Sequence, residues 1–112
     1  MGKYSYVFFT NAVEGRDDEY NAWYTGQHVP DVLQVPGFVA ATRYRLTEHG
    51  AMGPTAQHRY LIIYEVETDT PEAVLAELGH RAPEMVMSDA LRTDDLTGAL
   101  WEAITDRLVA KR

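Results

Sequence analysis

Residues 4–11 alternate as a β-strand does, yet they carry apolar side chains on both faces. Tyr4, Tyr6 and Phe8 point to one side of such a strand, and Val7 and Phe9 point to the other. A strand that is apolar on both faces must be covered on both. Because a chain of 112 residues forms one domain with a thin core, we expect a second copy of the chain to cover one face.

The rest of the chain divides into segments of strand or helix periodicity, separated by turn residues. Strands are predicted over 4–11, 38–46, 59–67 and 98–108, and helices over 18–34 and 72–78. A loop is predicted over 48–57, and residues 80–96 are expected to be irregular or weakly helical. The order β-α-β-β-α-β is that of a ferredoxin-like α+β domain over 1–112, with one antiparallel sheet and both helices on one face.

The first predicted helix contains a proline near its end. The ring of Pro30 collides with the carbonyl four residues back, at Gly26, so we expect a kink or a restart near Val29. Asp17 or Asp18 is expected to cap the start of this helix.

Two more boundaries and one face pattern follow from the residue types. Pro36-Gly37 is expected to end the first helix, and Gly79 is expected to end the second. The strand over 38–46 is predicted to have two unlike faces. One carries Phe38, Ala40, Thr42 and Tyr44, and the other carries Val39, Ala41, Arg43 and Arg45.

Composition excludes several classes of function. A net charge of −7 repels phosphate backbones, which argues against nucleic-acid binding. The absence of cysteine excludes disulfides and thiolate chemistry and suits a cytoplasmic protein. No signal peptide or membrane span is predicted. No two of the four histidines have a tight metal-ligand spacing, so no metal site is expected.

Two local strings carry a resemblance to a known family. They are Trp23-Tyr24-x-x-x-His28-Val29-Pro30-Asp31 and, entering the second strand, Val35-Pro36-Gly37-Phe38. With the element order, they make the chain similar to the dimeric α+β-barrel superfamily, nearest its EthD-like branch. The resemblance implies a homodimer with sheets packed face to face, and a small-molecule pocket between the helices and the sheet of each subunit. Members of the superfamily include isomerases, a polyketide cyclase, cofactor-free monooxygenases and haem-degrading enzymes.

His28 is the first candidate for chemistry, because imidazole both takes and gives protons near neutral pH. Asp31, three residues on, could orient that ring, and Tyr24 or Tyr64 could donate to a developing enolate. The alternatives are a surface or capping histidine, and an aspartate that merely begins the helix after Pro30.

Other residues are candidates for binding the substrate. Tyr6, Tyr64 and Trp101 could line an aromatic pocket, although packing in the core or the dimer interface explains them as well. Arg43 could neutralise an acidic ligand or be a surface group. Asn11 and His80 lie where haem-degrading and cyclase members keep functional residues, but a turn-forming Asn and a solvent-facing histidine are the alternatives.

Three functions remain open at this point. The first is a cofactor-free isomerase, cyclase or lyase that acts on a small, largely apolar cyclic or polyketide-like metabolite by proton transfer through His28. The second is a cofactor-free monooxygenase of an electron-rich aromatic compound. The third is a dimer that binds a small ligand, or is purely structural, without catalysis.

Overall fold

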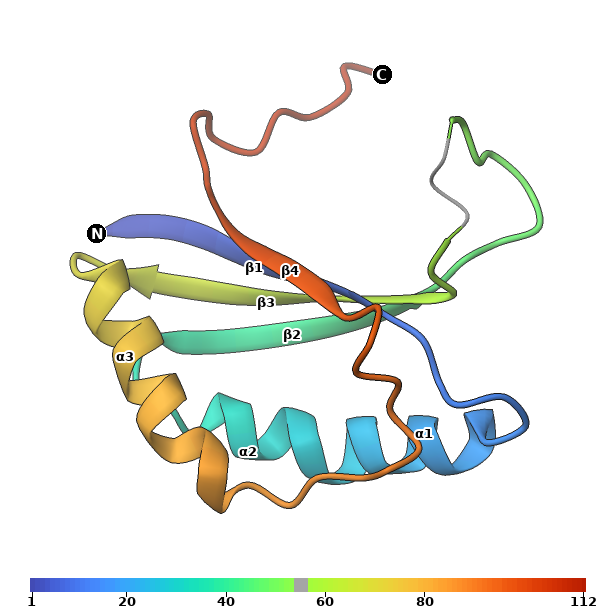
Figure 1. Ribbon diagram of the computed structural model, residues 1–112. Coiled ribbons are helices and arrows are strands. Elements are labelled where there is room, and N and C mark those ends of the chain that lie inside the picture. Colours follow the sequence, from blue (N-terminus) through green and yellow to red (C-terminus); the bar gives the residue numbers. More distant parts are fainter. Residues whose placement is uncertain (54–56) are drawn as a thin grey trace.

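The computed structural model describes residues 1–53 and 57–112, and shows a sheet with helices against it (Figure 1). The strands are β1 (Gly2–Thr10), β2 (Phe38–Arg45), β3 (Tyr60–Thr68) and β4 (Thr97–Glu102). The helices are α1 (Asp17–Trp23), the π-helical turn η1 (Tyr24–His28), α2 (Val29–Leu33), α3 (Pro71–Arg81) and the 3-10 turn η2 (Ala82–Glu84). Within the described ranges, no helix has the length and apolarity needed to cross a membrane.

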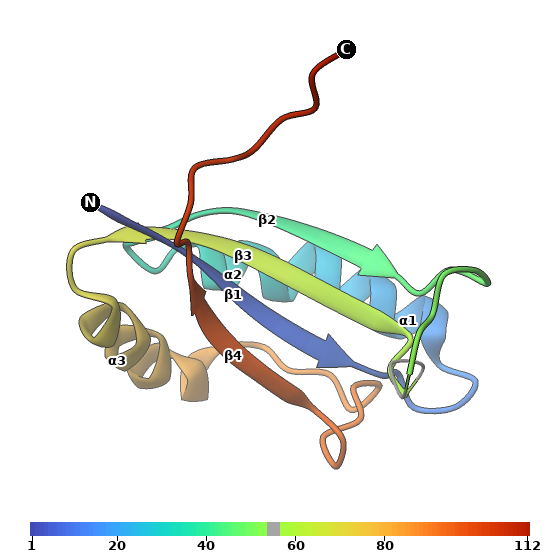
Figure 2. The same cartoon turned by 90° about the horizontal axis from the view of Figure 1, so that it is seen from above.

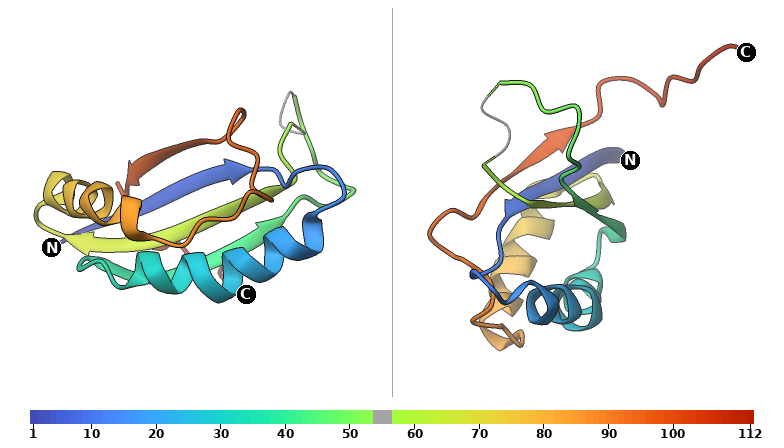
Figure 3. Two further views of the ribbon diagram at one scale, coloured as in Figure 1. Left: turned by 60° about the horizontal axis from the view of Figure 1, so that its bottom comes forward. Right: turned by 90° about the vertical axis from the view of Figure 1, so that its right-hand side faces the viewer.

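The four strands form one antiparallel sheet in the order β2-β3-β1-β4 (Figure 2). The α1–η1–α2 stretch and α3 lie on one face of this sheet, while the chain after β4 extends away on the other side (Figures 1 and 3). The predicted ferredoxin-like α+β fold is therefore confirmed. We call the face that carries the helices the helix face and the opposite face the open face.

The core lies between the helix face and the helices. Tyr20 of α1 and Val35, in the turn after α2, are fully buried, and Ile62 and Val66 from β3 are almost so. The hydroxyl groups of Thr10 and Tyr20 share a buried hydrogen bond that joins the end of β1 to α1. This contact fixes the height of the first helix above the sheet.

The distortion predicted near Pro30 is present as a π-helical turn. The backbone N–H of Val29 donates to the carbonyl of Tyr24, five residues back, where an α-helix would use the residue four back. Pro30 lies in the first turn of α2, where the lack of a backbone N–H costs no hydrogen bond. The wider turn thus absorbs the proline, and the helix continues to Leu33 without a separate restart.

The predicted face pattern of the second strand is wrong about Phe38, because β2 contains a bulge directly after it. Phe38 pairs with Val66, but Ala40 pairs with Glu65, so Val39 is an extra residue on β2. The extra residue reverses the alternation beyond it. Phe38 is on the helix face, and the residues predicted to share its face, Ala40, Thr42 and Tyr44, are on the open face. Arg43, opposite Ile62, is on the helix face.

Two boundary predictions are also corrected. The second helix does not end at Gly79: it runs to Arg81, whose side chain pairs with Glu77 at 2.6 Å across the glycine, and Pro83 follows. The last strand ends at Glu102 instead of residue 108. Beyond the bond from the Ala103 N–H to the Lys3 carbonyl only Gly2 of β1 remains, so the partner strand ends within one residue of this point.

The start of α1 has a different arrangement from the predicted cap. Its N-cap residue is Arg16, without a side-chain cap, and Asp17 accepts a hydrogen bond from the Tyr60 hydroxyl at 2.6 Å.

The predicted loop over 48–57 includes residues 54–56, which lie outside the described residues.

A close approach between β4 and β1 yields a stability prediction. A Cβ atom on Gly98 would lie 2.8 Å from Cγ of Phe8, closer than packed carbon atoms allow. Gly98→Ala should therefore lower the free energy of unfolding by about 1–3 kcal/mol in urea denaturation. Gly79→Ala is the control: a Cβ there meets nothing within 4 Å, and the helix should gain about 0.5–1 kcal/mol. Equal effects of the two changes would contradict this packing.

Candidate functional site

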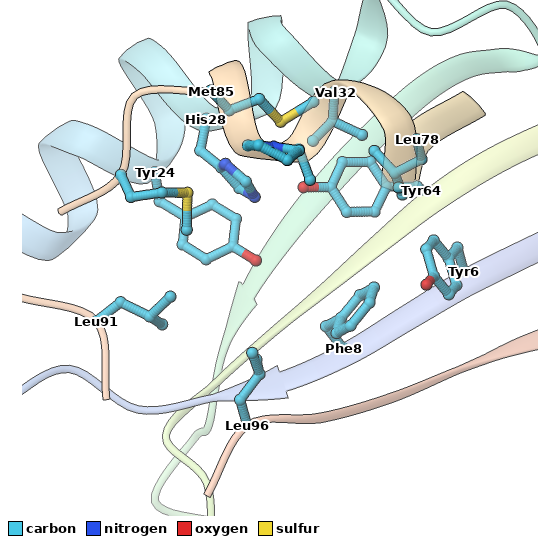
Figure 4. Close-up of a pocket in the computed structure, with 14 residues that line it drawn as sticks. Tyr6, Phe8, Tyr24, His28, Val32, Tyr64, Leu78, Met85, Leu91 and Leu96 are labelled. Atoms are coloured by element: carbon cyan, nitrogen blue, oxygen red, sulfur yellow. The ribbon is translucent and has the colours of Figure 1, made fainter. Parts of the chain in front are cut away.

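A cavity of about 470 Å³ lies between the helix face of the sheet and the helical layer (Figure 4). The strands β1 and β3, the turn η1, the helices α2 and α3, and the linker after α3 all contribute to its wall. The lining residues are Tyr6, Phe8, Tyr24, His28, Val32, Tyr64, Leu78, Gly79, Ala82, Pro83, Met85, Met87, Leu91 and Leu96. The volume suits a small organic ligand.

His28 is the last residue of η1, and its ring points into the cavity (Figure 4). The ring stacks on Trp23, with centroids 4.9 Å apart, and meets the edge of Tyr24 at 5.1 Å. Trp23 is itself held by a hydrogen bond of 2.8 Å from its indole N–H to the carbonyl of Val86. These contacts fix the orientation of the imidazole ring.

Burial determines the charge state of His28. It lowers the pKa of the imidazole, and the charge of Asp31 offsets only part of this effect, so the ring is neutral at neutral pH. Among the described residues, Nδ1 of His28 is buried without a hydrogen-bond partner. An unpaired N–H costs more than an unpaired acceptor lone pair, which favours the tautomer with its proton on Nε2.

Two tyrosines flank the inner edge of the His28 ring. The hydroxyl groups of Tyr24 and Tyr64 point toward each other across the cavity wall (Figure 4). Burial raises the pKa of Tyr24 to about 12 and raises that of Tyr64 further, so both are neutral phenols. Within the described part of the chain, Oη of Tyr64 lacks a partner at hydrogen-bonding geometry, although the Tyr24 hydroxyl is near enough to affect its pKa.

The cavity wall is uncharged. None of its lining residues is Asp, Glu, Lys or Arg, and its one histidine is neutral. A buried ionic group without a partner is strongly disfavoured in such surroundings. The wall therefore suits an apolar ring with an oxygen able to bond to the imidazole or phenol groups.

The predicted contact between Asp31 and His28 is not formed. The Asp31 carboxylate accepts a hydrogen bond of 2.8 Å from Gln27 and does not line the cavity. It acts on the imidazole through charge alone. A carboxylate that orients the imidazole through Nδ1 is thus absent from the described residues.

Of the other predicted site residues, some line the cavity and some do not. Tyr6 and Tyr64 line the cavity with His28 and Tyr24, while the remaining four candidates lie outside it. Trp101 is 61% exposed on the open face, and His80 is exposed on α3. Arg43 lies behind the Tyr24 ring.

Asn11 has a structural place outside the cavity. Its amide nitrogen donates to Asp95 at 2.8 Å and to the Gln57 carbonyl at 3.0 Å, and its amide oxygen accepts from the Arg59 N–H at 2.9 Å. It therefore joins the end of β1 to the start of β3 and to the linker before β4.

Much of the wall was not predicted from the sequence. Phe8 was predicted to share a face with Tyr6, which could have placed it there. Met85, Leu91 and Leu96 come from the irregular segment after α3, which has no periodicity to show which residues face inward. Within the described ranges, no three histidine or acidic side chains gather as metal ligands would.

No family model matches the sequence, and no curated protein matches it. Solved structures do match. A mutant of MhuD, with two manganese protoporphyrin IX molecules bound per active site, is 14% identical, with 95% of this chain and 99% of that chain covered and a TM-score of 0.62. An EthD-like protein from Ralstonia eutropha JMP134 is 13% identical, with 96% of each chain covered and a TM-score of 0.56.

A third match is a mutant of SnoaB, a cofactor-independent oxygenase from Streptomyces nogalater. It is 13% identical, with 92% of this chain and 94% of that chain covered and a TM-score of 0.52. At such low identity these likenesses show a common fold. The predicted resemblance to EthD-like proteins is thereby confirmed at the level of the fold: the chain shares its ferredoxin-like α+β architecture with EthD-like and oxygenase proteins.

Proposed function

We propose that the protein is a cofactor-free enzyme that acts on a small, uncharged cyclic metabolite by proton transfer through His28. The observation that carries this proposal is a pair of buried polar atoms, Nδ1 of His28 and Oη of Tyr64, that have no hydrogen-bond partner among the described residues and belong to side chains lining one uncharged cavity. Unpaired buried polar groups cost free energy, and a ligand oxygen reaching Tyr64 would remove part of that cost.

The low pKa of His28 restricts which proton it can remove. A weak base in an apolar cavity needs a ligand whose anion is delocalised, such as a 1,3-dicarbonyl ring or a benzylic ketone. The unprotonated ring nitrogen of His28, which is Nδ1 in the favoured tautomer, would accept the proton, and the Tyr24 hydroxyl would donate a hydrogen bond to the enolate oxygen as it gains charge. This sequence corresponds to an isomerase, cyclase or lyase.

A cofactor-free oxygenase is the second candidate. The likeness to SnoaB supports it at the level of the fold, and the same residues would deprotonate an electron-rich phenol that then reduces oxygen. A porphyrin suits this cavity poorly, because no cationic side chain of the described residues lines it to meet the propionate groups and His80 lies outside the lining. The third candidate, a binding protein without catalysis, uses the same cavity.

The proposal is tested with 2-tetralone, an uncharged bicyclic ketone with benzylic protons next to its carbonyl. We expect the protein to accelerate deuterium incorporation at that carbon in D₂O, measured by proton NMR. His28→Ala should slow the exchange by roughly 10²–10⁴-fold, as expected for lost acid–base catalysis. His80→Ala, at an exposed position, should leave the rate unchanged.

Ligand charge and oxygen uptake separate the candidates. 2-Naphthol should inhibit the exchange, whereas 2-naphthoate should not, because the cavity wall has no cation for a carboxylate. Oxygen uptake with 1,4-dihydroxynaphthalene would favour the oxygenase. Binding of 2-naphthol without exchange or oxygen uptake would leave only the binding protein.

The buried imidazole also predicts a pH dependence of stability. The unfolded chain takes up a proton near the ordinary histidine pKa of 6.5, while the folded state resists it to a lower pH. Unfolded molecules therefore bind more protons in this window, and the free energy of unfolding should fall as the pH falls from about 7 to about 5. His28→Gln should flatten this decline in urea titrations, and His80→Gln should not.

We also propose that the protein is a homodimer joined through the open face. Phe9, Tyr44 and Trp101 lie on this face and are 40%, 47% and 61% exposed. Exposed apolar groups on one face of a sheet are a typical interface. The resemblance to dimeric α+β barrels implies the same arrangement.

Light scattering checks the assembly. We expect a species of twice the 12.6 kDa chain mass at micromolar concentration. Trp101→Glu should shift it toward the monomer, because it buries a charge in an apolar interface. Val86→Glu, at a residue 58% exposed in the linker after α3, is the control and should leave the dimer intact. A native protein that is monomeric at this concentration would refute the proposal.

A further inference from the structure

Arg43 has an unusual environment for an arginine on a strand. It follows the bulge in β2, which turns it toward the helices. Its guanidinium carbon lies 4.7 Å from the centroid of the Tyr24 ring, 5.3 Å from that of Tyr20 and 5.9 Å from that of Tyr60. Three aromatic faces thus surround one cation, an arrangement that attracts it through the ring quadrupoles.

Two hydrogen bonds hold the guanidinium in place. Nη1 donates to Oγ1 of Thr25 at 2.9 Å, and Nη2 donates to Oδ1 of Asn21 at 2.9 Å. Both partners are neutral, and Arg43 forms no ion pair with any carboxylate of the described residues. Its positive charge is therefore not cancelled locally, although the chain as a whole carries a net charge of −7.

We propose that Arg43 is a positioning residue for the cavity: it holds the Tyr24 ring from behind and supplies an uncompensated positive charge to the phenol that faces the ligand. Arg43 itself does not line the cavity, so it would act through Tyr24. The role of Tyr24 toward a ligand rests on the proposed function, whereas the electrostatic effect of Arg43 on the phenol does not.

Several groups besides Arg43 affect the pKa of Tyr24. These groups are Tyr20 and His28 on the same helical stretch, Tyr64 on β3 and Arg43 on β2. Burial and Tyr20 raise the pKa of Tyr24, while the nearby Tyr64 hydroxyl and the charge of Arg43 lower it. His28 is neutral at neutral pH, so Arg43 is the cation that favours negative charge on the Tyr24 oxygen.

The test replaces Tyr24 with 3,5-difluorotyrosine, whose phenol is more acidic than that of tyrosine and titrates before the protein unfolds in alkali. Phenolate absorbance gives the pKa in the ligand-free protein. Arg43→Gln should raise this pKa by about one unit, a tenfold loss of acidity. Arg43→Lys should restore part of it, because the charge remains while the planar hydrogen-bonding fork is lost.

A second variant covers the case in which Arg43→Gln does not fold. Asn21→Asp keeps the shape of the partner but places a carboxylate on the guanidinium, so it should also raise the pKa at position 24. 3,5-Difluorotyrosine at position 4, where desolvation and nearby acidic groups but not Arg43 affect the pKa of the phenol, is the control and should not shift.

The outcomes bear on Arg43 alone. Unchanged pKa values at position 24 in Arg43→Gln, or in Asn21→Asp if the first variant is unfolded, would overturn the assignment. Because these titrations need no ligand, they are independent of the 2-tetralone experiment. A shift at position 24 without any exchange of 2-tetralone would support the positioning role and count against the proposed chemistry.

Discussion

The site depends on how the first helical stretch is attached to the sheet. The buried hydrogen bond between Thr10 and Tyr20 links the last residue of β1 to the middle of α1. Tyr20 also packs against Tyr24 and against Tyr60 of β3, so one residue joins the helix to both central strands. From this anchor the helix proceeds over the sheet with Tyr24 and His28 directed inward. The cavity lies farther along, where the sheet and the helical layer are closed by the linker after α3.

The π-helical turn carries two of the polar side chains that line the cavity. It begins at Tyr24 and ends at His28, and both residues face the ligand space. Pro30, two residues after its end, cannot accept the hydrogen-bond pattern of a continuous α-helix without a local change. Polar chemistry and backbone irregularity therefore occur in the same five residues, as is frequent for π-helical turns at functional sites. The surrounding wall is apolar, which keeps the imidazole and the phenols in their neutral forms.

The sequence was sufficient for the element order and the fold, because these follow from periodicity. It offered His28, Tyr24, Tyr6 and Tyr64 as site residues but left surface and packing alternatives open, because periodicity alone does not show which side chains border a cavity. It failed where a single inserted residue reverses the alternation of a strand, and where the length of a strand depends on the strand it pairs with. The bulge at Val39 leaves no sign in a run of small and polar side chains, so Phe38 and Arg43 were predicted on opposite faces of the strand although they share one. The length of β4 depends on where β1 begins, which the residues of β4 do not reveal. The Asp31 contact failed because Gln27, four residues before it, takes the carboxylate.

The bulge in β2 also determines what the open face shows to its surroundings. With an uninterrupted alternation from Phe38, the open face of this edge strand would carry Arg43 and Arg45, and a two-fold related copy packed sheet to sheet would bring a second set of the same charges toward them. One inserted residue replaces these cations with Thr42 and Tyr44 on that side. The same backbone irregularity that gives the interior a cation beside Tyr24 thus removes like-charge repulsion from the surface on which two copies would meet.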